Sequence, residues 1–69
     1  MKFVFYNDTG RMVYVHPATF IHGCKGNETP IQLLEVREFE LPVKTYPWVK
    51  MWDHDEKGLC ILVSPIKEE

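Results

Sequence analysis

The chain has 69 residues, enough for one domain, and its length sets a tight limit on the core. A chain of this size buries only about 60% of the surface that its unfolded form exposes. With 45% hydrophobic and 13% aromatic residues, the sequence can still supply a core, and it is too apolar for a disordered tail. We therefore expect a single domain that spans residues 1–69.

The charged residues give no sign of a nucleic-acid or membrane partner. The formal net charge is −2, from eight basic and ten acidic side chains that are interspersed along the sequence. Nucleic-acid binding normally requires clustered Lys and Arg, so we disfavour it. No apolar run approaches the roughly 20 residues that span a bilayer. The apolar segment Phe3–Tyr6 is also too short for a secretory signal, and we expect a cytoplasmic protein.

The first part of the chain carries the pattern of a hairpin. Residues 2–6 (KFVFY) and 11–16 (RMVYVH) are rich in side chains that favour strands. Between them stands the turn sequence Asn7–Gly10 (NDTG), in which Asn and Asp bond back to the backbone and Gly10 can take a positive φ. The pattern predicts an antiparallel pair that ends at Pro17, because proline lacks the N–H of a ladder hydrogen bond.

The middle of the chain has a weaker pattern. We expect a short extended piece over residues 18–22 and a loop over residues 23–30, which contain two glycines and a proline. Residues 31–41 suit either a helical turn or a strand. We prefer the strand because Val36 and Phe39 favour a sheet, with a β-bulge or break where the alternation slips between these two residues.

The last third predicts a second antiparallel hairpin. Strands over residues 48–53 and 59–64 flank His54–Gly58 (HDEKG), which is typical of a turn. Residues 59–64 contain no proline or charge that would protect a sheet edge, so we expect this strand to be central or covered by a partner. The whole pattern predicts an all-β fold of about five or six short strands, as a small antiparallel β-sandwich or a partly open barrel.

Four residues of one parity form a candidate binding surface: Tyr46, Trp48, Lys50 and Trp52. They share one side of the predicted strand because alternate residues point the same way. If exposed, such a row can stack on partner side chains, bases or sugars. The alternative is that both tryptophans lie in the core while Lys50 reaches water along its stem. We favour the core placement, because so small a domain needs its largest side chains inside.

A second candidate site is a zinc or copper site made by His16, His22 and Cys24. Imidazole and thiolate suit both metals, and the sequence His22-Gly23-Cys24 brings two ligands close together. The spacing matches no paired Cys-x-x-Cys pattern, and ordinary structural roles for these residues are the alternative. Residues 53–58 begin like a calcium loop, but Ser64 stands where a bidentate Glu is required, so we expect a solvated turn.

Catalytic motifs are absent from the sequence. It has no G-x-S-x-G, no phosphate-binding glycine loop and no H-E-x-x-H, and so few residues rarely enclose a substrate pocket. Cys24 and Cys60 are expected as reduced thiols. The leading hypothesis is a non-enzymatic module that binds another protein or itself, with a homodimer preferred to a monomer. Metal binding is the alternative, and binding of single-stranded nucleic acid or sugar through a tryptophan face is the third hypothesis.

Overall fold

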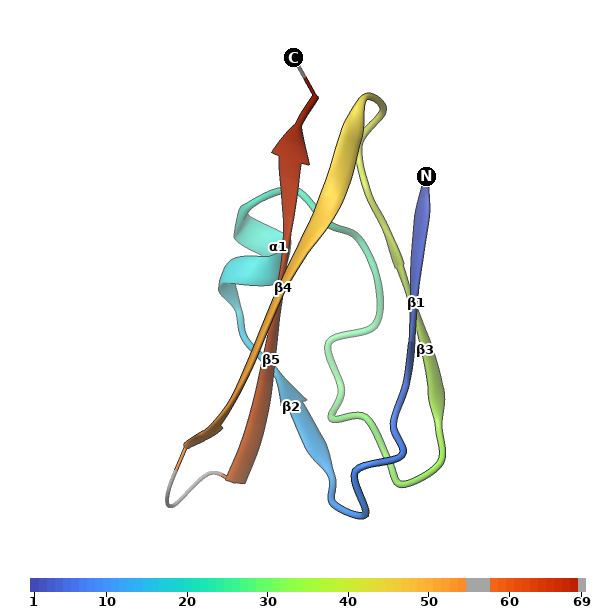
Figure 1. Ribbon diagram of the computed structural model, residues 1–69, viewed down its shortest axis with the longest axis vertical. Coiled ribbons are helices and arrows are strands. Elements are labelled where there is room, and N and C mark those ends of the chain that lie inside the picture. The colour runs from blue at the N-terminus through green and yellow to red at the C-terminus, as the bar shows by residue number, and fades with distance from the viewer. Residues whose placement is uncertain (55–57, 69) are drawn as a thin grey trace.

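The computed structural model describes residues 1–54 and 58–68, and in this part of the chain it contains five strands and one short helix (Figure 1). The strands are β1 (Lys2–Tyr6), β2 (Val13–Val15), β3 (Val36–Glu40), β4 (Thr45–His54) and β5 (Gly58–Lys67), and the helix is α1 (Ala18–Ile21). The prediction of a mostly β chain is confirmed. The strands form two sheets, and neither closes into a barrel. Most of the predicted turn His54–Gly58 lies outside the described residues.

Sheet A contains β1 and β3, and sheet B contains β2, β5 and β4 in that order. In sheet A the two strands are antiparallel. In sheet B, β4 and β5 are antiparallel, whereas β2 runs parallel to β5, so the prediction of a purely antiparallel fold is wrong for this pair. The predicted C-terminal hairpin is confirmed and extends beyond residues 48–53 and 59–64. β5 is central in its sheet, which is one of the two arrangements that its sequence led us to expect.

The predicted hairpin between residues 2–6 and 11–16 is wrong. β1 pairs with β3, and β2 pairs with β5, so the two segments belong to different sheets. The turn residues themselves behave as the sequence indicated, and Gly10 has a φ of 79°. What the local sequence could not show is that this turn carries the chain across the molecule from one sheet to the other.

Asn7 fastens the crossover between the sheets. Its side chain is fully buried, and its amide nitrogen lies 2.8, 3.2 and 3.0 Å from the carbonyl oxygens of Arg11, Ile31 and Gln32. Its amide oxygen accepts hydrogen bonds from the backbone N–H and the hydroxyl group of Thr9. A buried amide is stable only with such partners. Asn7 therefore links the turn after β1 to the segment that precedes β3.

Two predictions for the middle of the chain are also wrong. Residues 18–22, expected to be extended, contain the whole of the single-turn helix α1, which begins after Pro17 and is followed by His22 as its C-cap. Proline suits the start of a helix, because the first N–H groups there have no intrahelical partner. The strand preferred for residues 31–41 is confirmed over Val36–Glu40 only. Arg37 and Phe39 are both buried, so the strand alternates regularly and the expected bulge or break is wrong.

Arg37 anchors the loop that precedes β3. Its buried guanidinium group donates hydrogen bonds to the carbonyl oxygens of Asn27, Thr29 and Pro30, and it forms an ion pair with Glu35 at 2.7 Å. A backbone N–H and this guanidinium group lower the pKa of the Glu35 carboxyl group. The predicted loop over residues 23–30 is thus present, and a buried cation holds it against sheet A.

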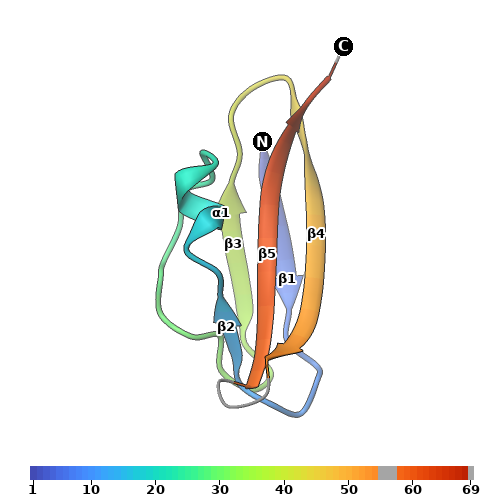
Figure 2. The ribbon, with the colours of Figure 1, turned by 90° about the vertical axis from the view of Figure 1, so that its left-hand side faces the viewer.

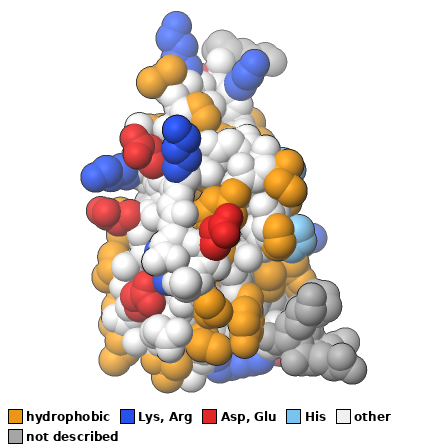
Figure 3. Space-filling model, turned by 180° about the vertical axis from the view of Figure 1, so that it is seen from behind, with side chains coloured by type: hydrophobic (Ala, Val, Ile, Leu, Met, Phe, Trp, Pro, Cys, Tyr) orange, Lys and Arg blue, Asp and Glu red, His pale blue; other side chains and the backbone are white. Residues whose placement is uncertain are grey.

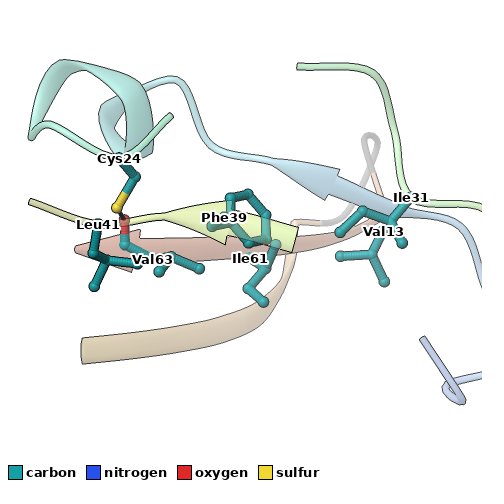
Figure 4. Packing of buried hydrophobic residues seen from close by; sticks show 7 residues of the cluster. All are labelled: Val13, Cys24, Ile31, Phe39, Leu41, Ile61 and Val63. Carbon is teal, nitrogen blue, oxygen red and sulfur yellow. Dashed lines mark hydrogen bonds between the residues drawn. The ribbon is translucent and has the colours of Figure 1, made fainter. Parts of the chain in front are cut away.

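The core lies between the two sheets (Figure 4). Its buried apolar residues are Val13, Cys24, Ile31, Phe39, Leu41, Ile61 and Val63. Phe3 and Phe5 of β1 cover this cluster from sheet A. Burial raises the pKa of the Cys24 thiol, whose sulfur lies 3.6 Å from the Val63 carbonyl oxygen. Cys24 is a free thiol packed in the core, as the sequence led us to expect for one of the two cysteines.

The role of Asn7 can be tested with a nearly isosteric change. Asn7→Asp places a carboxylate beside three carbonyl oxygens, and we expect it to cost about 3–5 kcal/mol of unfolding free energy at neutral pH. Burial raises the pKa of the new carboxyl group, so protonation favours the folded state and the penalty shrinks as the pH falls through that raised pKa. Urea unfolding between pH 7 and pH 4 measures this recovery, and Asn7→Ala, which has no titrating group, should not show it.

The orientation of the side chains in β5 gives a second test. Leu62 lies opposite Lys50 on the outer side of sheet B and is only half-buried, whereas Val63 is fully buried in the core. We therefore expect Val63→Lys to unfold the domain. Leu62→Lys should leave it folded with a loss of about 1 kcal/mol, although β5 is central. Circular dichroism and thermal melting distinguish these outcomes, and unfolding by both variants would contradict the assignment of the faces.

Candidate functional site

The outer side of sheet B carries the residues that the sequence singled out for binding. Val49 and Met51 of β4 lie opposite Val63 and Ile61 of β5, which are buried in the core. Residues directly opposite each other on antiparallel strands share a face of the sheet. The alternate residues of β4 therefore point away from sheet A, and Figure 2 looks onto this outer side, which neither β1 nor β3 covers.

We call this surface the aromatic face, and its residues are Tyr14 of β2, Tyr46, Trp48, Lys50 and Trp52 of β4, and Cys60 and Leu62 of β5. The four predicted binding residues thus lie together. The prediction that both tryptophans lie in the core is wrong, because the side chain of Trp48 is 47% exposed. The core is filled by smaller aliphatic side chains and by phenylalanines from sheet A, so the tryptophans are not required there.

Trp52 is the better-packed tryptophan of the aromatic face. Its ring lies 5.8 Å from the ring of His16, and the Lys50 ammonium nitrogen lies 5.5 Å from its centroid. The His16 ring is held in place because its Nδ1 atom accepts a hydrogen bond from the backbone N–H of Ala18. Lys50 therefore contacts an aromatic surface within its own chain, as a cation–π pair.

The main chain of β4 presents hydrogen-bonding groups at the border of sheet B. The N–H of Val63 donates to the Thr19 hydroxyl group, and the carbonyl oxygen of Ile61 accepts a bond from the β2 side, so both point away from β4. The pairs Val49–Val63 and Met51–Ile61 are therefore non-hydrogen-bonded pairs of the antiparallel ladder. The N–H and C=O groups of Val49 and Met51 consequently point away from β5. β4 ends the sheet in the described part of the chain, so these groups face an open edge (Figure 2).

Side chains on the inner side of β4 are exposed as well. Val49 is 41% exposed and Met51 is 37% exposed, although both face the side on which sheet A lies. The two strands of sheet A do not extend under β4, which lies beyond β1 at the right-hand border of Figure 2. At the end of β4, Arg11 donates a hydrogen bond to Asp53 and lowers the pKa of that carboxyl group. β4 therefore has apolar side chains exposed on both of its sides.

The three predicted metal ligands have separate roles in the described structure. His16 accepts a hydrogen bond from the Ala18 N–H, the Nδ1 atom of His22 contacts the hydroxyl group of Ser64, and Cys24 lies in the core. Over residues 1–54 and 58–68, no group of three or more His, Cys, Asp and Glu side chains is arranged to hold a metal ion. Metal binding stays a prediction that no contact of these residues favours.

Two hollows open elsewhere on the described surface. One, of about 510 Å³, is lined by Val15, Pro17, Phe20, Ile21 and Glu28. The other, of about 380 Å³, is lined by His22, Pro42, Val43, Lys44, Thr45, Pro65, Lys67 and Glu68. Neither includes a residue of the aromatic face. Seen from the side opposite β4, acidic and basic side chains are interspersed with apolar ones (Figure 3), which is not the pattern of a phosphate-binding surface.

The open edge of β4 was missed in the sequence. A signal was present, because residues 46–52 are apolar at both parities except for Lys50, which is typical of a strand covered on both faces. The sequence alone does not say which strands lie beside β4. Only the folded chain shows that this largely apolar strand pairs with a single neighbour, β5.

Comparison with known proteins adds no assignment to this geometry. Neither a protein-family model, nor a curated protein, nor a solved structure matches the chain. In the described residues, no helix is both long and apolar enough to cross a membrane.

The different surroundings of the two tryptophans can be measured by fluorescence. In the single-tryptophan variants Trp52→Phe and Trp48→Phe, we expect acrylamide to quench Trp48 more strongly than Trp52, because Trp52 packs against His16 and Lys50. Protection of Trp48 in the dilute protein would contradict its exposure on the aromatic face. Protection that appears only at high protein concentration would instead indicate that a second chain covers this residue.

Proposed function

We propose that this protein is a non-enzymatic interaction module that binds another protein chain along β4, with the aromatic face as part of the contact. The observation that carries the proposal is the open edge of β4, where Val49 and Met51 direct main-chain groups outward and expose apolar side chains. A partner strand that adds to such an edge gains main-chain hydrogen bonds, while its side chains select the partner. We class the fold as a small two-layer β-sandwich that is open along β4.

The chemistry of this surface favours a protein partner over nucleic acid. Lys50 is the one lysine or arginine among the residues that define the aromatic face, all of which are described. Binding to nucleic acid normally depends on several phosphate contacts, each of which needs a cation. Unpaired backbone N–H and C=O groups of a strand, by contrast, are satisfied by the backbone of another strand.

A flat, aromatic surface also suits binding better than catalysis. Tyrosine and tryptophan supply large contact areas and are enriched where proteins meet. The hollows of about 510 and 380 Å³ are both lined by residues outside the aromatic face. The proposed contact therefore combines a polar main-chain edge with apolar side chains on either side of it.

Site-specific photo-crosslinking tests the proposed surface. Tyr46 on the aromatic face is replaced by a photoreactive phenylalanine analogue, and Tyr6 on the outer side of sheet A serves as the matched control, because both tyrosines are about half-exposed. In cells that express the chain, we expect protein adducts at position 46 that disappear in the additional variant Val49→Lys. Equal labelling at positions 46 and 6, or adducts unaffected by Val49→Lys, would contradict binding along β4.

A further inference from the structure

We propose that the strand that binds along β4 is β4 of a second copy, paired antiparallel about a two-fold axis at Val49. This inference rests on the proposed function, because it names the partner of the same open edge. In such a homodimer, the sheet B of each copy joins the other through β4. The two aromatic faces then lie on the same side of one continuous sheet, since a two-fold axis perpendicular to the sheet keeps each face on its own side.

The main-chain groups of β4 match those of an identical strand in this register. Val49 of each copy lies opposite Val49 of the other, and Met51 lies opposite Pro47. Val49 and Met51 both direct N–H and C=O groups to the open edge, as the hydrogen-bonded pairs of an antiparallel ladder require. Pro47 lacks an N–H group, but its carbonyl oxygen points to the same edge and can accept the N–H of Met51.

Side chains on the aromatic face are complementary in the same register. Lys50 of one copy stands opposite Trp48 of the second copy, and Tyr46 stands opposite Trp52. The first pair sets an ammonium group beside an aromatic ring, an arrangement that Lys50 already forms with Trp52 in its own chain. The second pair sets two aromatic side chains across neighbouring strands, which stabilises a sheet.

The inner side of β4 is covered by the same contact. Val49 meets its symmetry mate, and Met51 meets Pro47 of the second copy, so six apolar side chains, three from each copy, lose exposure together. These are the positions at which sheet A leaves β4 bare, with Val49 41% and Met51 37% exposed. Pairing therefore removes from water the apolar area that a single copy leaves uncovered.

Neighbouring registers are less favourable for a physical reason. An axis at Lys50 sets two ammonium groups directly opposite each other, and like charges in that position destabilise a sheet. An axis at Met51 sets Val49 against Asp53, whose carboxyl group is kept ionised by Arg11. Lysine and proline residues, such as Lys50 and Pro47, often protect an edge strand from pairing with another chain. In the register centred on Val49, Lys50 faces an aromatic ring and the carbonyl oxygen of Pro47 accepts a hydrogen bond, so both residues are accommodated.

Solution mass and stability test the homodimer. We expect light scattering of the purified chain to show twice the monomer mass as concentration rises, and Val49→Lys to give a folded monomer with dimer affinity at least about tenfold weaker. The matched control is Val4→Lys, another half-exposed valine on a border strand, which lies on the outer side of sheet A and should remain dimeric. Thermal melting establishes that both variants are folded.

Disulfide trapping tests the register independently of Val49→Lys. In a Cys60→Ser background, Val49→Cys should form a disulfide-linked dimer on oxidation, because the two Cα atoms of opposed residues lie within bonding range. Met51→Cys should not, since its symmetry mate lies about four residues away along the strand. A monomer at every concentration without trapping at position 49, or trapping at position 51 instead, overturns the proposal.

The photo-crosslinks at position 46 separate the two proposals. An adduct with peptide 48–53 of a second copy supports the homodimer. An adduct with a different protein, together with a monomeric purified chain, overturns the homodimer and leaves binding along β4 intact. Adducts that do not depend on β4, in a chain that remains monomeric, overturn both.

Discussion

The buried side chain of Asn7 determines how this chain divides into two sheets. Its amide nitrogen lies within hydrogen-bonding distance of carbonyl oxygens on both sides of the crossover, at Arg11 in the turn and at Ile31 and Gln32 before β3. A polar group in the core would be costly without these bonds. With them, the chain leaves sheet A after β1 and enters sheet B as β2, instead of turning back to form a local hairpin.

That crossover has consequences for every other strand. Once β1 is free of β2, it pairs with β3, and the residues before β3 are held by the buried guanidinium group of Arg37. β2 lies beside β5 and makes it the central strand of sheet B, which leaves β4 at the border. A two-stranded sheet A does not reach under that border. The exposure of Val49 and Met51 is thus a result of topology, not of an unusual local sequence.

The proposed function follows from this uneven division of strands. A border strand with apolar residues on both sides is unfavourable in water, and a partner that covers it gains both apolar contact and main-chain hydrogen bonds. Lys50 and Pro47 limit which strands fit, since one adds a charge and the other removes an N–H group. A second copy of β4 satisfies both restrictions, because it carries aromatic rings opposite the charge and an N–H group opposite the proline carbonyl.

The sequence by itself determined the elements that depend on neighbouring residues: the strand of residues 2–6, the turn with positive φ at Gly10 and the C-terminal hairpin. These follow from local propensity, turn chemistry and alternation. Only the tertiary structure decided that β2 runs parallel to β5, that Trp48 lies outside, and that His16, His22 and Cys24 take separate roles. Each of these depends on contacts between residues distant in the chain, above all those of Asn7 with residues 31 and 32, and no local pattern encodes such contacts.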